Sequence, residues 1–521
     1  MKSRSYDFVI IGGGTAGCVL ASRLSEDGRN NVLLLEAGPR DRYPWIHIPI
    51  GYAKTMFHPI YNWRFETEPE PNMNGRRVYW PRGRCLGGSS SINGLIHVRG
   101  QPKDYDDWEA AGNSGWGWND IQQYFNRWKI STTNIKEPHE LIDAIIRAGN
   151  ELGVPTTNDF NCGEQEGVGY YQLFTKNGLR SSSATSYLRA AEKRSNLEVR
   201  CLAQATKILF KNNRAVGVRY RQNNVDFEVR AGREVILAAG AIQSPQLLQL
   251  SGIGPGVLLQ KFGIKTVIDL PGVGENLQDH LQLRLMFKCT KPITTNDELK
   301  SVWRTCAIGL KWLLWRKGPL AIGINQGGLF TRVLQESKTP DVQFHFATLS
   351  AELAGANPHP WPGFTMSVCQ LRPASRGFVR IGSPDPFEAP KIQPNYLGAD
   401  LDRRCAVAAL RFARQLASTR ALSPYIDEEY RPGNAFQSDK QLLDFSRQYG
   451  ATIFHPSGTC KMGRDTMAVV DDRLRVHGVT GLRVVDCSIM PNLVSGNTAG
   501  PVVMIAEKAS DLIREDMRSV L

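Results

Sequence analysis

The sequence contains no long uncharged apolar run and no low-complexity tract. No segment reaches the ~20 apolar residues that a membrane-spanning helix needs. Charged residues make up 22% of the chain without any polar repeat, so the composition excludes the disordered and fibrous classes. The ten cysteines form no CxxC, CxC or Cys/His cluster, which argues against a disulfide scaffold and a zinc site. We therefore expect free thiols, no metal and a reducing, cytoplasmic location.

Basic residues outnumber acidic ones, but they are dispersed along the sequence. Lys and Arg number 63 against 50 Asp and Glu, a net charge of +13, with neither dense basic runs nor zinc-finger spacings. We therefore expect no nucleic-acid partner. The 521 residues exceed the ~250–300 at which a single core stops growing, so at least two domains are expected.

A dinucleotide-binding pattern opens the chain. Residues 6–11 (YDFVII) are a short apolar run of strand type, and residues 12–17 (GGGTAG) follow directly. A helix pattern continues to Leu24, and a second buried strand, 31–35 (NVLLL), ends at Glu36. Strand, glycine turn, helix, strand and acidic residue thus occur in the order of a βαβ dinucleotide fold.

Each glycine of this pattern has a physical role. Gly12 permits the tight turn, Gly14 lets the backbone approach a pyrophosphate, and Gly17 allows the helix to pack closely on the strand. The phosphates lie at the helix N-terminus, and Glu36 stands where an acceptor for ribose hydroxyls is required. NAD and FAD both use this fingerprint, which leaves the choice between them open.

Residues 81–94 (PRGRCLGGSSSING) combine glycine clusters, a serine triplet and two arginines without a helix or strand period. Such a loop offers many backbone N–H groups to a large polar cofactor. The alternative is a flexible surface loop. Leu86, Ile92, Leu95 and Ile96 argue against it, because a solvated linker would not carry these apolar residues.

With these motifs the sequence resembles the glucose–methanol–choline (GMC) family of FAD-dependent oxidoreductases over essentially the whole chain. The matching segments are 61–63 (YNW), 68–71 (EPEP), 81–100, 240–255, 271–280 (PGVGENLQDH), 454–463 (FHPSGTCKMG) and 483–501. The resemblance implies FAD as the cofactor and oxidation of an alcohol, expected to be a primary one, by proton abstraction and hydride transfer to flavin N5. It also implies an electron acceptor, either a quinone or dye or O2.

The resemblance implies an α/β fold, α+β overall. We expect a Rossmann-like FAD-binding domain (1–155, 196–282 and 450–521) and a discontinuous substrate domain (156–195 and 283–449) on an antiparallel sheet. Residues 196–240 read as short strands that close the flavin sheet. The strand-like segments 283–290, 341–349, 364–372 and 377–381 alternate as a sheet with one wet face would, and together with a helix over 401–421 they resemble the substrate domain.

The resemblance also assigns residues to the site. The cofactor-binding residues are Gly12, Gly14, Thr15, Ala16, Gly17, Glu36, Ala37, Trp63, Arg82, Leu86, Gly87, Gly88, Ser89, Asn93, Gly94, Leu95, Ile96, Ala205, Ala239, Gly240, Asp486 and Pro501. Nine histidines are present and none stands out by itself. The family's HPxGT motif places the catalytic base at His455, and its partner position at Asn497, whose amide can orient and stabilise but cannot abstract a proton.

Two departures from the family pattern matter. Members that attach FAD covalently use a histidine in the first signature, and Ile92 stands at the matching position here, so we expect non-covalent FAD. Residues 497–501 (NTAGP) resemble the aryl-alcohol oxidase branch, whereas 460–463 (CKMG) resemble the alcohol and choline dehydrogenase branch. The substrate and the acceptor are therefore left open.

Other functions were weighed against this one. The family includes redox-silent hydroxynitrile lyases and fatty-acid photodecarboxylases, and the photodecarboxylase branch lacks the histidine found at His455. A non-catalytic flavoprotein is a further alternative, against which His455 and Asn497 argue.

A basic segment with three tryptophans, residues 299–320, can be read in two ways. It could lie on the inner face of a membrane, with aromatic rings at the interface. We favour a helix whose apolar face packs in the core of the substrate domain, and we expect it to contribute only weakly to binding anionic vesicles.

Overall fold

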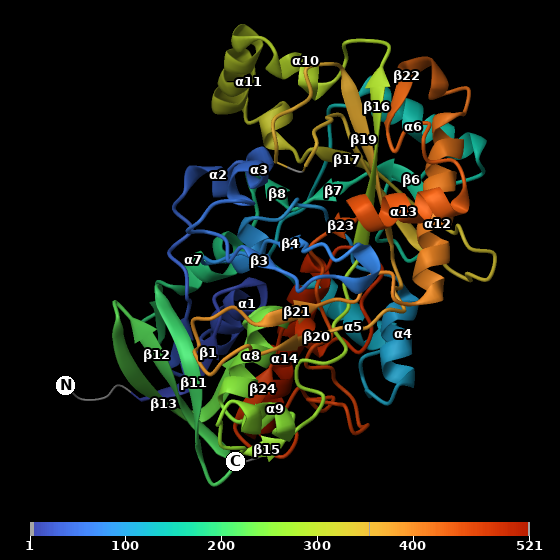
Figure 1. The fold of residues 1–521 in the computed structure, drawn as a ribbon. Coiled ribbons are helices and arrows are strands. Elements are labelled where there is room, and N and C mark those ends of the chain that lie inside the picture. The colour runs from blue at the N-terminus through green and yellow to red at the C-terminus, as the bar shows by residue number, and fades with distance from the viewer. Residues whose placement is uncertain (1–4, 354, 519–521) are drawn as a thin grey trace.

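The protein is described by a computed structural model that covers residues 5–353 and 355–518. Two seven-stranded sheets, each with its own hydrophobic core, organise the chain (Figure 1).

The first sheet has the strand order β10-β2-β1-β13-β12-β11, and β24 pairs with β13. Its strands are β1 (Tyr6–Ile11), β2 (Val32–Leu35), β10 (Leu197–Arg200), β11 (Ala203–Lys211), β12 (Arg214–Gln222), β13 (Val225–Leu237) and β24 (Leu482–Val484). Pairing is parallel from β10 to the second half of β13 and β24, and antiparallel among β11, β12 and the first half of β13. Ile11 lies in register with both Leu35 and Leu237. The loops that follow these strands therefore leave the same edge of the sheet, as in a Rossmann-like fold.

Helix α1 (Thr15–Leu24) begins at the glycine turn and packs against the long C-terminal helix α14 (Ala499–Arg518). A Cβ atom on Gly17 would lie 1.9 Å from the carbonyl oxygen of Gly12. Only glycine allows this approach of helix and turn, as the spacing predicts.

The second sheet is antiparallel, with the order β22-β16-β19-β18-β17-β6, and β23 pairs with β16. Its strands are β6 (Gly167–Tyr170), β16 (Leu281–Cys289), β17 (Asn325–Thr331), β18 (Val342–Ala347), β19 (Gly363–Gln370), β22 (Ile426–Arg431) and β23 (Ala451–Thr452). Helices α6 (Glu140–Glu151), α12 (Asp400–Ala417) and α13 (Asp439–Tyr449) belong to the same core.

Two expectations about this sheet are wrong. The segment predicted at 377–381 is β20 (Phe378–Arg380), which pairs only with β21 (Lys391–Gln393) outside the sheet. The central strands of the sheet also lack a wet face, because every residue of β18 and all but the last residue of β19 are buried. α12 packs against β19 on one face, and the other face lines an internal cavity, so alternation of polar and apolar residues reflects the cavity rather than bulk solvent.

Helices α10 (Thr295–Leu299) and α11 (Val302–Trp315) lie at the top of Figure 1, beyond the second sheet. No residue of α11 is buried, so the expectation that its apolar face packs in the core is wrong. Within the described ranges, no helix is long and apolar enough to cross a membrane.

Shorter elements complete the fold. They are α2 (Pro44–His47), α3 (Tyr52–Thr55), α4 (Pro102–Ala110), α5 (Trp118–Asn126), α7 (Arg189–Ala191), α8 (Gly240–Leu250), α9 (Gly256–Lys261), and the paired strands β3 (Phe65–Glu66) with β4 (Tyr79–Trp80), β5 (Thr133–Asn134) with β7 (Gln172–Leu173), β8 (Thr175–Lys176) with β9 (Leu179–Arg180), and β14 (Ile253–Gly254) with β15 (Ile268–Asp269).

Candidate active site

A cavity of about 330 Å³ lies where the carboxyl edge of the first sheet meets the inner face of the second. Most residues proposed from the sequence line it. These are Gly12, Gly14, Thr15, Ala16, Glu36, Ala37, Trp63, Arg82, Gly88, Ser89, Asn93, Gly94, Leu95, Ile96, Ala205, Ala239, Gly240, His455, Asp486 and Asn497. The chain therefore brings residues from distant parts of the sequence together at one cavity.

Four of the proposed cofactor residues are not part of the cavity wall: Gly17, Leu86, Gly87 and Pro501. Gly87 instead donates its backbone N–H to the carbonyl of Gly13 at 2.7 Å, and Leu86 packs beside the same glycine. Gly87 and Leu86 therefore contact the glycine turn rather than the cavity.

The wall fits a dinucleotide. A Cβ on Gly14 would meet no atom closer than 3.9 Å, so this backbone faces open space at the start of α1. The Glu36 carboxylate accepts hydrogen bonds from the backbone N–H groups of Gly13 at 2.8 Å and Gly38 at 2.7 Å. Burial raises the pKa of Glu36 to about 7. A carboxyl group held in this way can pair with ribose hydroxyls, and the glycine backbone with phosphate.

His455 and Asn497, both from the C-terminal part of the chain, lie next to each other in the cavity wall. The amide Nδ2 of Asn497 lies 3.2 Å from Nε2 of His455, and its Oδ1 accepts a hydrogen bond from Gln343 Nε2 at 3.0 Å. Because Gln343 donates to Oδ1, the NH₂ group of Asn497 is turned toward the histidine. Asn497 also lies just before α14, whose positive N-terminal end favours negative charge nearby.

The tautomer of His455 follows from a second histidine, His280. Nε2 of His280 lies 3.0 Å from the carbonyl oxygen of Leu371, which can only accept, so this nitrogen carries the proton. Burial lowers the pKa of His280 to about 4, so the ring is neutral and its Nδ1 is an acceptor. That Nδ1 lies 3.0 Å from Nδ1 of His455, which must therefore be the donor. The lone pair of His455 is left on Nε2, the atom that faces Asn497.

Burial also lowers the pKa of His455 well below its ordinary value of 6.5, and the positive charge of Arg82 lowers it further. The imidazole is thus unprotonated at neutral pH. A neutral histidine with its free lone pair toward a cavity is the form that a general base requires.

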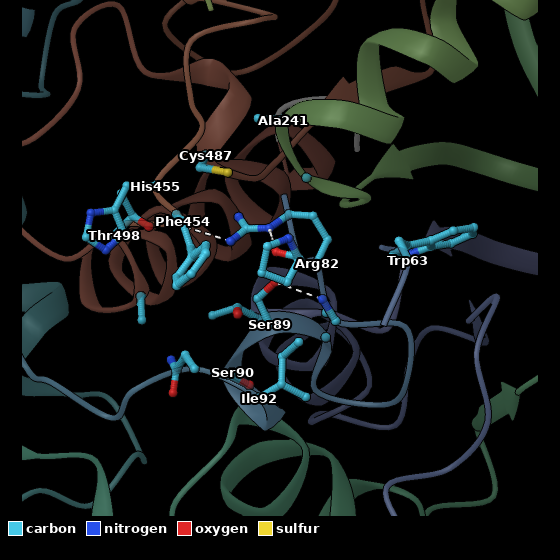
Figure 2. A pocket seen from close by; sticks show the side chains of 18 of the residues that line it. Trp63, Arg82, Ser89, Ser90, Ile92, Ala241, Phe454, His455, Cys487 and Thr498 are labelled. Carbon is cyan, nitrogen blue, oxygen red and sulfur yellow. Dashed lines mark hydrogen bonds between the residues drawn. The ribbon is translucent and has the colours of Figure 1, made fainter. Parts of the chain in front are cut away.

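The backbone at His455 is fixed by a buried carboxylate. Asp279 accepts a hydrogen bond from the His455 N–H at 2.7 Å and another from the Thr452 hydroxyl at 2.6 Å. Phe454, just before the histidine, has a left-handed φ of 74°, which is strained for an aromatic residue. Arg82 donates to the Phe454 carbonyl at 2.6 Å, and Figure 2 shows its guanidinium beside that residue. These contacts hold the imidazole at the cavity.

Sequence reasoning missed the residues that the second sheet contributes. Arg284, Ser367 and His345 are cross-strand neighbours on β16, β19 and β18, and all three line the cavity. Both ring nitrogens of His345 are buried, and neither has a well-formed hydrogen bond within the described residues. Burial lowers the pKa of His345 to about 3. Buried polar atoms of this kind, facing a cavity, are suited to hold a ligand oxygen.

The fold and the cavity define the class of the protein as a dinucleotide-dependent oxidoreductase. Two family models, both described as GMC oxidoreductase, match residues 6–282 and 373–506. The chain belongs to the GMC oxidoreductase family, whose members use FAD and act on CH–OH donors. The resemblance seen in the sequence is thereby confirmed.

Known relatives extend over nearly the whole chain. It is 39% identical over 535 residues to an alcohol dehydrogenase [acceptor] of Pseudomonas putida, with 99% of this chain and 97% of the relative covered. It is 44% identical over 531 residues to an oxygen-dependent choline dehydrogenase of Cronobacter sakazakii, with 98% and 95% covered. The crystal structure of pyridoxine 4-oxidase from Mesorbium loti superposes with a TM-score of 0.89 at 30% identity, covering 98% of this chain and 99% of that one.

Proposed function

We propose that the protein oxidises an uncharged primary alcohol to its aldehyde, with His455 as the base and Asn497 as the hydrogen-bond donor to the substrate oxygen. The observation that carries the proposal is the pair at the wall, His455 Nε2 with its lone pair and Asn497 Nδ2 with its N–H, 3.2 Å apart. A hydroxyl oxygen in the cavity within hydrogen-bond distance of both atoms gives its proton to the first and accepts a hydrogen bond from the second.

FAD, when bound, supplies the hydride acceptor, flavin N5. The residues of the chain handle the proton. His455 Nε2 takes the hydroxyl proton, and the Nδ1 proton of the same ring stays hydrogen-bonded to His280. Asn497 and the N-terminal end of α14 stabilise the negative charge that grows on the alcohol oxygen.

The electron acceptor of the second half-reaction is proposed to be a quinone-type molecule or O2. The names of the relatives support both, since one is an [acceptor] dehydrogenase and another is oxygen-dependent. Anaerobic reoxidation of the reduced protein by a quinone, compared with aerobic peroxide formation, distinguishes them.

Choline is disfavoured by the charges around the substrate half of the cavity. Arg82 and Arg284 line the cavity, and the acidic residues among its lining are Glu36 and Asp486, at the edge of the first sheet. Both carboxylates are engaged by backbone N–H groups. A quaternary ammonium group would thus face two guanidinium groups without a counter-charge.

We therefore expect choline to reduce the flavin with a kcat/KM about tenfold or more below that of 3,3-dimethyl-1-butanol, its uncharged isostere, corresponding to ~1.4 kcal/mol of electrostatic cost. The measurement is anaerobic flavin bleaching by each alcohol. Arg284→Gln should reduce the difference in kcat/KM between the two alcohols. Lys261→Gln, on α9 outside the cavity, should leave that difference unchanged. A wild-type preference for choline would contradict the proposal for an uncharged substrate.

FAD is expected to be bound without a covalent link. Ile92 lines the cavity at the family's attachment position and offers only hydrocarbon. Cys487 also lines it, but burial raises the pKa of its thiol to about 12, which keeps it from acting as a thiolate nucleophile. Acid precipitation should release all yellow colour into the supernatant. A washed precipitate that stays yellow would show a covalent link.

A further inference from the structure

Helix α11 carries an apolar face that the protein itself does not cover. In the described part of the chain 18 large apolar side chains are exposed, and seven of them fall within residues 299–315. We call them the α11 surface: Leu299, Val302, Trp303, Leu310, Leu313, Leu314 and Trp315. The exposed fractions of Trp303 and Leu313 are 85% and 61%. Single exposed apolar residues are ordinary, but a contiguous group of this size marks a contact surface.

The helix is anchored along one edge, which leaves the other edge free. Trp312 donates its indole N–H to the Gly178 carbonyl at 3.0 Å, and Lys311 pairs with Glu137 at 2.9 Å. The half-buried Ile308, Trp312 and Arg316 follow one another at intervals of four residues, the period of a helix face. The opposite face carries Trp303, Leu310, Leu313 and Leu314, again at helical spacing.

The charge of the segment indicates what covers this face. Residues 299–320 contain no Asp or Glu and five basic residues, at positions 300, 304, 311, 316 and 317. Two of the five form ion pairs, Lys300 with Asp297 and Lys311 with Glu137, each at 2.9 Å. The other three flank the exposed apolar face, Arg304 at one end and Arg316 and Lys317 at the other. A second copy of the same surface would bring two positive helices together, which opposes self-association. An anionic lipid surface complements both the charge and the apolar face, and exposed tryptophans suit the headgroup region.

The length of the helix defines how it would meet a bilayer. Fourteen residues are too few to span the ~30 Å of hydrocarbon, so α11 would lie in the plane of the interface. Just after α11 the chain reaches Ile324 and Asn325, which line the cavity, and the backbone N–H of Ile324 donates to the Tyr52 hydroxyl at 3.3 Å. Leu353, 65% exposed, lines the same cavity. The chain that leaves α11 thus runs within ten residues to the cavity wall, and α11 contacts residues 319–321 on the way.

We propose that the α11 surface docks the protein onto a bilayer containing anionic lipid. Docking in this orientation places the rim of the cavity beside the bilayer. The proposal concerns binding alone and stands independently of the substrate and of the acceptor.

The test is co-flotation of the FAD-loaded protein with vesicles of phosphatidylcholine that contain phosphatidylglycerol, compared with pure phosphatidylcholine, at low and at high salt. We expect binding to the anionic vesicles that falls by about tenfold or more when salt rises from ~0.05 to ~0.5 M. Trp303→Ser combined with Leu313→Ser should abolish it, and Arg304→Gln with Lys317→Gln should remove its salt dependence.

Val257→Ser combined with Lys261→Gln, on the exposed side of α9, is the matched control and should bind as the wild type does. All variants should keep the melting temperature and the flavin spectrum of the wild type, because the exchanged side chains are exposed. Vesicle binding that survives the Trp303/Leu313 exchange would overturn the proposal. So would failure of the wild type to bind vesicles, and so would a dimer that the same exchange dissociates in sedimentation experiments, which would identify a second copy as the occupant.

Discussion

His455→Ala is expected to slow flavin reduction by substrate ~10²–10⁴-fold, the usual contribution of a positioned general base. The reason is that neighbouring groups fix the lone pair of His455 on Nε2, facing Asn497. The Leu371 carbonyl holds the proton of His280 on Nε2, and Nδ1 of His280 then accepts the Nδ1 proton of His455. The rate is to be measured by rapid anaerobic mixing, because steady-state turnover can be limited by the acceptor half-reaction.

The His455→Ala protein should keep its FAD, since the glycine turn at 12–17 and the loop at 81–94 lie on other segments of the wall. Added imidazole should restore part of the rate by occupying the vacated space. His477→Gln is the matched control: His477 contacts the Gly463 carbonyl and is not part of the cavity wall. Reduction of the His455→Ala flavin at nearly the wild-type rate would show that another residue is the base.

The parts of the site that could be predicted from sequence are those whose geometry is local. Gly12, Gly14 and Glu36 were placed correctly on one edge because strand, turn and helix follow one another within thirty residues, and parallel register brings strand ends together. The positions of His455 and Asn497 came from family motifs, and the structure brings the two side chains within 3.2 Å. Their roles stay predictions until they are tested.

The residues that sequence reasoning missed are joined by long-range pairing. His280 lies directly before β16 and His345 lies on β18, and β19 separates these two strands in the sheet. Nothing local distinguishes these histidines from the other seven of the chain. The only signal for His280 was its place at the end of the motif 271–280, and no feature of the sequence pairs it with His455.

The error about residues 299–320 has a different cause. An amphipathic pattern specifies that one face is apolar, but it does not specify what that face contacts. In the structure the helix is attached to other segments through Trp312 and Lys311, and the apolar face that was expected in the core is turned outward.

Asn497→Ala is expected to slow flavin reduction ~10²–10³-fold, as the loss of an oxyanion-type donor does elsewhere. The amide is oriented by Gln343 so that its NH₂ group faces His455 and the cavity, where charge develops on the alcohol oxygen. The effect should fall mainly on the reduction rate and less on the apparent substrate affinity, since the interaction strengthens as the charge grows.

Two further exchanges at Asn497 distinguish hydrogen-bond donation to the substrate oxygen from a purely structural role of the side chain. Asn497→Asp keeps the shape but replaces the donor by a carboxylate, so it should be at least as slow as Asn497→Ala, because it repels the developing charge. Asn497→His restores an N–H donor and should recover part of the rate. If Asn497→Asp reduced its flavin as fast as the wild type, hydrogen-bond donation from this position would not contribute to the reaction, and Asn497 would serve only to hold the segment that precedes α14.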